Sequence, residues 1–321
     1  MTRALFAAAT LFMMVAPSVS AQDAIGRFMP MRGEMVSAAY EGWWPNDDGS
    51  FTMFFGYFNT NWEQQFDIPV SERNYFTLTE PGMLDDLEHD AFDRGQADQG
   101  QPTHFYPRRN PFLFTIQVPA DFGDKEWVWT LRSAGAVSRA YGILSADYRI
   151  DPQVISTEVG GNFGDLDNRL RENIPPELEV EGDTHRSVRV GQPLRLVAHA
   201  NDPDDYPPRS NRRLPQNTEE LYRGPGGVVV QGAPGLRMHW AVYRGPASAV
   251  SFDPVQLKTW MDSRVYSNSP WSPPFVLPEV PADNRWEARV TFDQPGEYTL
   301  RAVASDGSQF TYRNVNVTVT P

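Results

Sequence analysis

Short apolar runs separated by turn-forming residues dominate this chain of 321 residues. The runs are rich in β-branched and aromatic residues, which favour strands, and many prolines and glycines separate them. Such runs lie at 51–58, 112–118, 127–131, 194–200, 236–243, 288–292, 298–305 and 315–319. We find no long segment with apolar residues at helical spacing, as a helical or parallel α/β protein would need. The pattern therefore predicts an all-β protein.

The run "FTMFFGYF" at 51–58 is apolar at both alternating sets of positions. Because alternate side chains of a strand point to opposite faces, this pattern favours a central strand buried on both sides over a one-sided platform for sugar rings. The preceding run at 36–44 and the turn "PNDDGS" predict a hairpin. Trp43, Trp44 and Trp62 lie where these strands end, and are candidate exposed rings for binding.

The segment "GGNFGDLDNRLRENIPPELEVEG" at 160–182 indicates a boundary between two domains. Glycines begin it, charged residues fill it, and two prolines stiffen its end in an extended form. We expect an N-terminal β-sandwich at 30–155, a linker at 156–174 with one helical turn, and a second β-sandwich at 175–321. Both sandwiches are expected to be antiparallel.

The second half contains "VRVGQPLRLVAHANDPDD", "LRMHWAVYRGP", "ARVTFDQPGEYTLRAVASDG" and "FTYRNVNVTVTP". It resembles a PKD-like or cadherin-like extracellular sandwich, a relative of the immunoglobulin architecture found in bacterial surface and secreted proteins. The resemblance implies that Trp240 is a core indole and that Tyr298 forms a tyrosine corner. Leu300 takes the place of the second cysteine of an immunoglobulin domain, with Leu196 as its apolar partner. The N-terminal half resembles no family.

Two connections in the second half, at 205–235 and 253–285, are longer than a bare sandwich needs. The second contains Trp260, Tyr266 and Trp271, which makes it too aromatic for a disordered linker. It either covers a face of the sandwich or brings its rings to a partner.

Acidic residues are expected at one pole of the second sandwich. Asp202 and Asp204 follow one strand and Asp306 precedes another, and in the immunoglobulin order these loops emerge together. Oxygen ligands from several turns suit Ca²⁺. Aspartate before proline or glycine is also ordinary turn chemistry. The sequence leaves both readings open, and calcium is the one cofactor it suggests.

The first residues predict a secretory signal peptide over 1–21, with a basic Arg3, a short apolar stretch and small residues before Gln22. We expect a periplasmic or secreted protein without a membrane anchor. The chain has no cysteine and a formal net charge of −13, which argues against nucleic acid as a partner.

The chain contains no zinc-protease, nucleophile-elbow, P-loop or dinucleotide motif. His89 and His104 are candidate metal ligands, but they lack the fixed spacing that marks a metal site. We therefore predict an exported, non-catalytic binding or structural module that acts through protein–protein contact. A glycan binder using loop aromatics and a periplasmic hydrolase with paired carboxylates are the alternatives.

Overall fold

The computed structural model describes residues 30–80, 95–158, 168–209, 213, 216–221, 234–256 and 277–321. Trp260, Tyr266, Trp271 and His89 lie outside these residues, as does the predicted signal peptide. The chain is all-β, as predicted, and the apolar runs named above lie in strands, except that Leu236 comes just before β12. No helix in this described part is long and apolar enough to cross a membrane.

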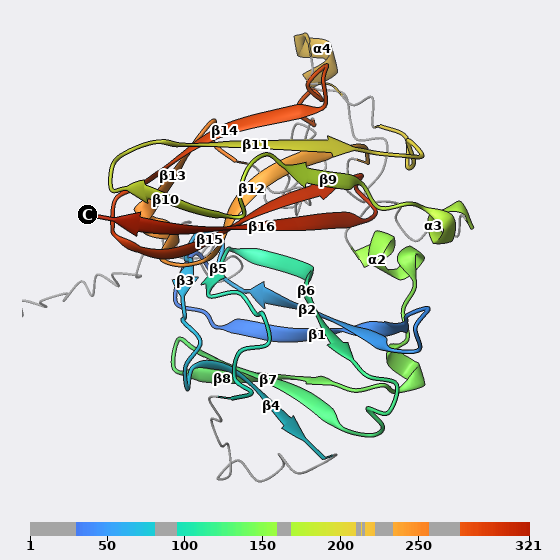
Figure 1. The fold of residues 1–321 in the computed structure, drawn as a ribbon. Helices are drawn as coiled ribbons and strands as arrows, with labels where there is room; N and C mark the ends of the chain where they lie inside the picture. Colours follow the sequence, from blue (N-terminus) through green and yellow to red (C-terminus); the bar gives the residue numbers. More distant parts are fainter. Residues whose placement is uncertain are drawn as a thin grey trace, which may run out of the picture.

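Four sheets stack face to face (Figure 1). The first sheet has the order β4 (Asn74–Thr79), β7 (Glu126–Ser133), β8 (Ala136–Gly142), and the second has the order β1 (Val36–Pro45), β2 (Phe51–Asn59), β6 (Arg108–Val118). The third has the order β10 (His185–Arg189), β16 (Phe310–Thr320), β15 (Gly296–Ser305), β12 (Arg237–Arg244). The fourth has the order β13 (Val250–Asp253), β14 (Arg285–Phe292), β11 (Leu194–Asn201), β9 (Glu177–Val180). A small pair, β3 (Phe66–Asp67) with β5 (His104–Phe105), lies beside the junction of the two halves.

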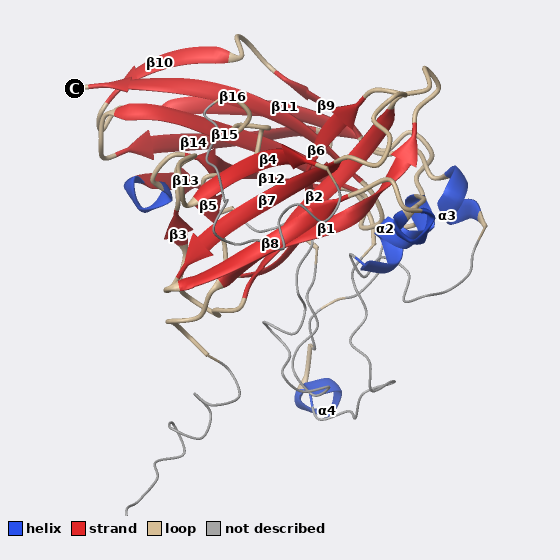
Figure 2. Cartoon of the chain, turned by 90° about the horizontal axis from the view of Figure 1, so that it is seen from below, coloured by secondary structure: helices blue, strands red, loops and turns tan. Residues whose placement is uncertain are grey.

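The described helices are short. They are α2 (Pro152–Glu158), α3 (Arg169–Glu172) and α4 (Thr218–Leu221), with 3-10 turns at Ala146–Tyr148 and Ala247–Ala249. In Figure 2, α2 and α3 lie together beyond one end of the strands, and α4 lies apart from both. The helical turn α3 falls inside the predicted linker, whereas α2 was not predicted.

Strand β2 is buried on both faces, as its sequence predicts. Met53 and Phe55 pack into the core between the first and second sheets, while Phe54 packs on the other side with Phe112 and Ile150. The predicted hairpin is present, since β1 pairs with β2 from Val36 opposite Asn59 to Pro45 opposite Phe51.

The third and fourth sheets form an immunoglobulin-like sandwich, in which β9, β11, β14 and β13 correspond to strands A, B, E and D, and β12, β15 and β16 to C, F and G. Trp240, Leu196 and Leu300 lie in its core, as the resemblance implied. The tyrosine corner is present, because the Tyr298 hydroxyl donates to the Gln294 carbonyl oxygen at 3.0 Å.

The third sheet is buried on its second face as well, against the second sheet. Tyr243 and Val303 belong to the same apolar cluster as Phe55 and Trp129 of the first half. Polar contacts hold this junction: the Tyr312 hydroxyl donates to the Phe112 oxygen at 2.5 Å. The two sandwiches therefore share a packed face.

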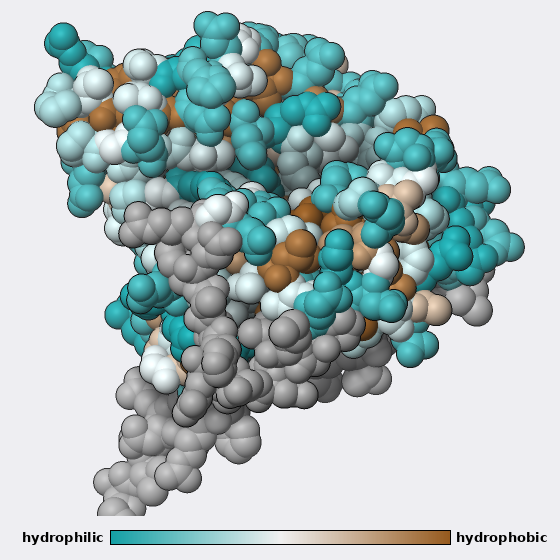
Figure 3. Space-filling model, turned by 60° about the horizontal axis from the view of Figure 1, so that its bottom comes forward, coloured by the Kyte–Doolittle hydropathy of each residue, from teal (hydrophilic) through white to brown (hydrophobic). Residues whose placement is uncertain are grey.

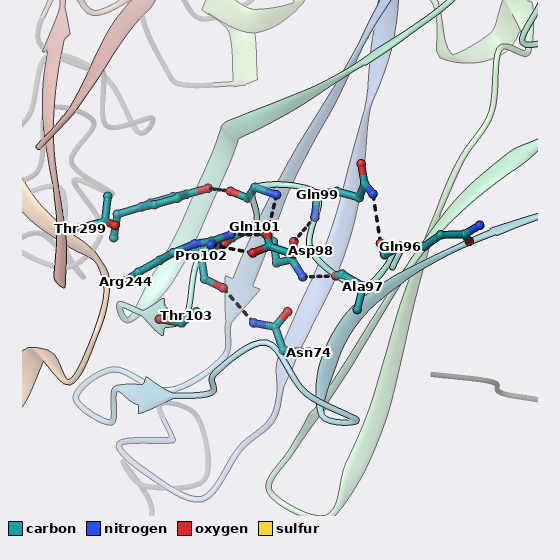
Figure 4. A network of polar contacts seen from close by, with 12 residues as sticks. Asn74, Gln96, Ala97, Asp98, Gln99, Gln101, Pro102, Thr103, Arg244 and Thr299 are labelled. Carbon is teal, nitrogen blue, oxygen red and sulfur yellow. Dashed lines mark hydrogen bonds and ion pairs between the residues drawn. The ribbon is translucent and has the colours of Figure 1, made fainter. Parts of the chain in front are cut away.

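A loop of the first half fastens the junction at one end (Figure 4). Arg244 at the end of β12 pairs with Asp98 through two N–H groups at 2.9 and 2.6 Å, and its Nε donates to the Gln101 oxygen at 2.9 Å. On the other side of the loop, Asn74 donates to the Pro102 oxygen at 2.8 Å. The loop thus ties β4 of the first sheet to β12 of the third.

Candidate functional site

A cavity between the two sandwiches

A cavity of about 590 Å³ lies where the two sandwiches meet. That size is typical of a site that takes a small ligand or a few side chains of a peptide. Trp62, Tyr106 and Arg108 line it from the first half, and Trp240, Ala241 and Arg301 line it from the second. On the face that Figure 3 shows, by contrast, apolar residues form separate patches among hydrophilic ones. The concave junction is therefore the stronger candidate site.

The first-half wall is a stack of aromatic rings and one cation. Arg108 begins β6 with φ at 65°, and its guanidinium carbon lies 4.7 Å from the centre of the Phe58 ring and 4.3 Å from that of Trp62. Its Nη1 donates to the Thr60 oxygen at 2.7 Å, which fixes the side chain. Cation–π contacts of this kind add about 0.5–2 kcal/mol each.

Arg301 supplies the second cation, from the middle of β15. It is 7% exposed, and its guanidinium lies 3.4 Å from the centre of the Tyr243 ring and 4.9 Å from that of Tyr312. Its Nε donates to the Asn314 side-chain oxygen at 2.8 Å and its Nη1 to the Leu113 oxygen at 2.6 Å. These contacts hold the charge at the junction of the sandwiches.

The cavity runs along the edge of β12, which is the last strand of its sheet. Beyond Val242 the first half occupies this edge, because the Tyr243 oxygen accepts from the Thr103 amide at 3.0 Å. Side chains hold the outward amides there: Trp240 N donates to the Gln256 Oε1 at 2.9 Å, and Val242 N donates to the Tyr106 hydroxyl at 2.9 Å. Burial raises the pKa of Tyr106 to about 12, so its hydroxyl is neutral. The indole Nε1 of Trp240, itself buried, has no hydrogen-bond partner.

His104 lies at the cavity wall but is engaged in structural contacts. Its Nδ1 lies 2.7 Å from the Asp67 Oδ1 and its Nε2 lies 2.8 Å from the Gln65 Oε1. The same Asp67 oxygen accepts from the Ala247 amide at 3.3 Å, so this group also joins the two halves.

The described residues that line the cavity include no aspartate or glutamate. They do include two arginines and two histidines, in a chain whose formal net charge is −13. The cavity therefore offers cations and N–H donors and lacks anionic acceptors among these residues.

The predicted site residues

The acidic residues of the predicted pole do come together. Asp204, Asp205 and Asp306 act on Asp202 electrostatically, and burial, Asp204 and the other two carboxylates raise the pKa of Asp202 to about 7. Burial likewise raises the pKa of Asp306 to about 6.

These carboxylates accept hydrogen bonds from residues of the turn after β15 and of the linker. Asp306 Oδ1 accepts from the Ser308 and Gln309 amides at 2.6 Å each, and its Oδ2 accepts from the Asn173 side chain at 2.9 Å. Asp204 Oδ2 accepts from the Ile174 amide at 3.2 Å. Among the described residues no group of three or more acidic, histidine or cysteine side chains has an arrangement that could hold a metal ion. Calcium at this pole stays a prediction.

The predicted binding tryptophans do not form one surface. Trp43 packs against Phe51, with ring centres 5.3 Å apart, and its indole donates to the Ser145 oxygen at 2.7 Å. Trp44 lines a separate, open hollow beside α2. Of the three, only Trp62 lines the cavity.

Of the two arginines after His104, Arg109 pairs with Glu41 of β1 at 2.7 and 2.6 Å, and Arg108 stacks on rings. The sequence analysis named none of Arg108, Arg109 and Arg301 as a site residue. The sequence did hold one signal for Arg301, which is a charged residue inside the apolar run "YTLRAVAS". In an isolated immunoglobulin-like sandwich, the side of the strand on which this arginine lies would face solvent.

Comparisons with known proteins

No protein-family model and no curated protein sequence matches the chain. Solved structures that resemble it include titin domains Z1Z2 in complex with telethonin, with 10% identity, coverage of 88% of this chain and 90% of that chain, and a TM-score of 0.22. The adhesin InvE of Yersinia pseudotuberculosis has 13% identity, coverage of 89% and 58%, and a TM-score of 0.23. Fibronectin(III)-like modules of Clostridium thermocellum CbhA have 9% identity, coverage of 89% and 94%, and a TM-score of 0.21. At these scores the immunoglobulin-like assignment rests on the strand order and the tyrosine corner.

Proposed function

We propose that the chain is an exported, non-catalytic binding module of the periplasm or cell exterior, which acts by taking an extended segment of a partner protein alongside β12. The observation that carries this proposal is the edge of β12 from Trp240 to Val242, which lies inside the cavity and has no described strand paired beside it. The PKD-like or cadherin-like relationship and the predicted signal peptide agree with such a role and stay predictions.

The edge of β12 has the properties of a strand acceptor. Variable-type immunoglobulin domains add a further strand beside strand C, the position that β12 holds here. In this chain the outward amides of Trp240 and Val242 bond to side chains instead of to a strand. The Gln256 side chain, a primary amide, stands where a peptide carbonyl would accept from Trp240. An incoming strand can replace that contact at little cost, since one amide oxygen exchanges for another.

The cavity suits such a ligand in size and lining. Main-chain hydrogen bonds to an edge supply affinity in this mode, and pockets for alternate side chains supply specificity. The half-buried Ala241 leaves space over the strand, with Trp62 and Tyr106 on the facing wall. Glycan stacking is less well supported, because the Arg108 guanidinium lies over the Trp62 ring. The hydrolase alternative requires a carboxylate pair, which the described lining residues do not provide.

The test is binding of blocked octapeptides that alternate valine and threonine with a randomised central residue. Ala241→Phe fills the space over β12, and we expect it to weaken peptide binding at least tenfold while the melting temperature stays close to that of the wild type. Val137→Phe is the matched control, because Val137 lies on the edge strand β8 and is 42% exposed. Absence of peptide binding by the wild type, or equal loss in both variants, would contradict the proposal.

A further inference from the structure

Arg301 is a buried cation whose described partners are all neutral. Its guanidinium contacts one amide oxygen, one backbone oxygen and two tyrosine rings, and the ion pairs among the described residues do not include it. Buried charges are usually paired with an opposite charge, because removing an ion from water is costly. Arg301 therefore keeps an unneutralised positive charge at the wall of the cavity.

Two other arginines of the same junction, Arg109 and Arg244, differ in this respect. Arg109 forms a two-pronged pair with Glu41, and Arg244 forms one with Asp98. Arg109 and Arg244 are thus each neutralised by a carboxylate of the protein. Arg301, which lines the cavity, is not neutralised in this way by any described residue. This contrast points to a ligand as the source of the missing carboxylate.

The register of the third sheet gives that carboxylate a place. Arg301 lies directly opposite Ala241 across the β15–β12 pair, so the two side chains share the face toward the cavity. A strand bound beside β12 would lie two strand spacings from β15, about 10 Å. The residue of β12 that lies between such a strand and Arg301 in this register is Ala241, whose side chain is a single methyl group. An acidic side chain of the bound strand and the arginine, both long, can reach toward each other past this small residue.

From these observations we infer that the bound partner segment presents an aspartate or glutamate opposite Ala241, and that Arg301 recognises its carboxylate; the inference rests on the proposed function. Arg108 adds a second positive charge on the facing wall. With no aspartate or glutamate among the described lining residues, the field at this point favours an anionic side chain and opposes a lysine.

The test compares three blocked octapeptide sets that share valine and threonine flanks and carry glutamate, glutamine or lysine at the centre. We expect the glutamate set to bind the wild-type protein at least tenfold tighter than the glutamine set at low salt, and the lysine set to bind weakest. The advantage should shrink as salt is raised. Equal binding by the glutamate and glutamine sets would overturn the inference and leave the proposed function standing. Failure of all three sets to bind would overturn both.

The variant Arg301→Gln tests whether Arg301 is the residue that recognises the carboxylate, and Arg244→Gln is the matched control. Both variants remove a guanidinium from the junction, but Arg244 is not among the residues that line the cavity. We expect Arg301→Gln to bring the ratio of glutamate to glutamine binding close to one, and Arg244→Gln to preserve it. A preserved ratio in folded Arg301→Gln would overturn the inference. If that variant does not fold, the wild-type peptide series decides alone.

Discussion

Asp202→Asn should stabilise the protein at neutral and higher pH. In the folded chain burial and the nearby carboxylates raise the pKa of Asp202 to about 7 from 3.8. The folded state therefore binds a proton more tightly than the unfolded state. As pH rises, the unfolded state releases the proton of Asp202 first, at about pH 4, and the folded state releases it only at about pH 7. The contribution of Asp202 to the free energy of unfolding is therefore fully present below about pH 4 and is lost as pH rises toward about 7. Asparagine keeps the shape and removes the charge.

The size of the effect follows from the shift. About three pKa units correspond to about 4 kcal/mol, since one unit is worth 1.36 kcal/mol. Asp202 is only partly buried, so solvent screening reduces this figure, and we expect a gain of about 1–2 kcal/mol at pH 8. At pH 4 the wild type and the variant should differ by less than about 0.5 kcal/mol.

The assay is urea unfolding followed by tryptophan fluorescence at several pH values between 4 and 8. Asp121→Asn is the control, because Asp121 is exposed on a turn of the first half. The difference in unfolding free energy between Asp202→Asn and the wild type should grow with pH, while the control shows no such trend. A variant that is less stable than the wild type at pH 8 would refute the reasoning.

Four further predictions follow from the fold. Trp240→Ala should cost about 3–5 kcal/mol in urea melts, because the indole is buried in the second core, and a loss below about 1 kcal/mol would argue against that placement. Tyr298→Phe should cost about 1 kcal/mol by removing the hydrogen bond to Gln294, and no loss would mean that this bond adds nothing. If the acidic pole binds calcium, the melting temperature will be higher in several millimolar Ca²⁺ than in chelator at matched ionic strength, whereas identical melts would assign these carboxylates to turn and linker contacts alone. N-terminal sequencing of protein from the native host should find Gln22 first; uncut protein in the cytoplasm would contradict export.

Local patterns in the sequence were enough to predict the strands, and the family resemblance added the second core. The resemblance to an immunoglobulin-like sandwich implied that Trp240 and Leu300 lie inside and that Tyr298 forms a tyrosine corner, and the structure has all three. The burial of β2 on both faces could also be predicted, because the strand is apolar at both alternating sets of positions. These features depend on neighbours along one strand or one hairpin.

The cavity depends on contacts between residues far apart in the chain, which the pattern does not record. Arg301 and Leu113 meet only because the third sheet packs on the second. An arginine in an apolar run reads as a solvated residue when one face of the sheet is assumed to meet water. The acidic pole was predictable because loops of an immunoglobulin-like order converge, whereas the linker contacts of Asp204 and Asp306 were not.

Amide hydrogen exchange at β12 tests the central claim most directly. The outward amide of Trp240, now bonded to the Gln256 side chain, should exchange at least tenfold more slowly when the glutamate-centred octapeptide is bound. The inward amide of Ala241, which faces β15 within the sheet, serves as the internal reference and should change little. Saturating peptide that leaves exchange at Trp240 unchanged would contradict strand addition at this edge.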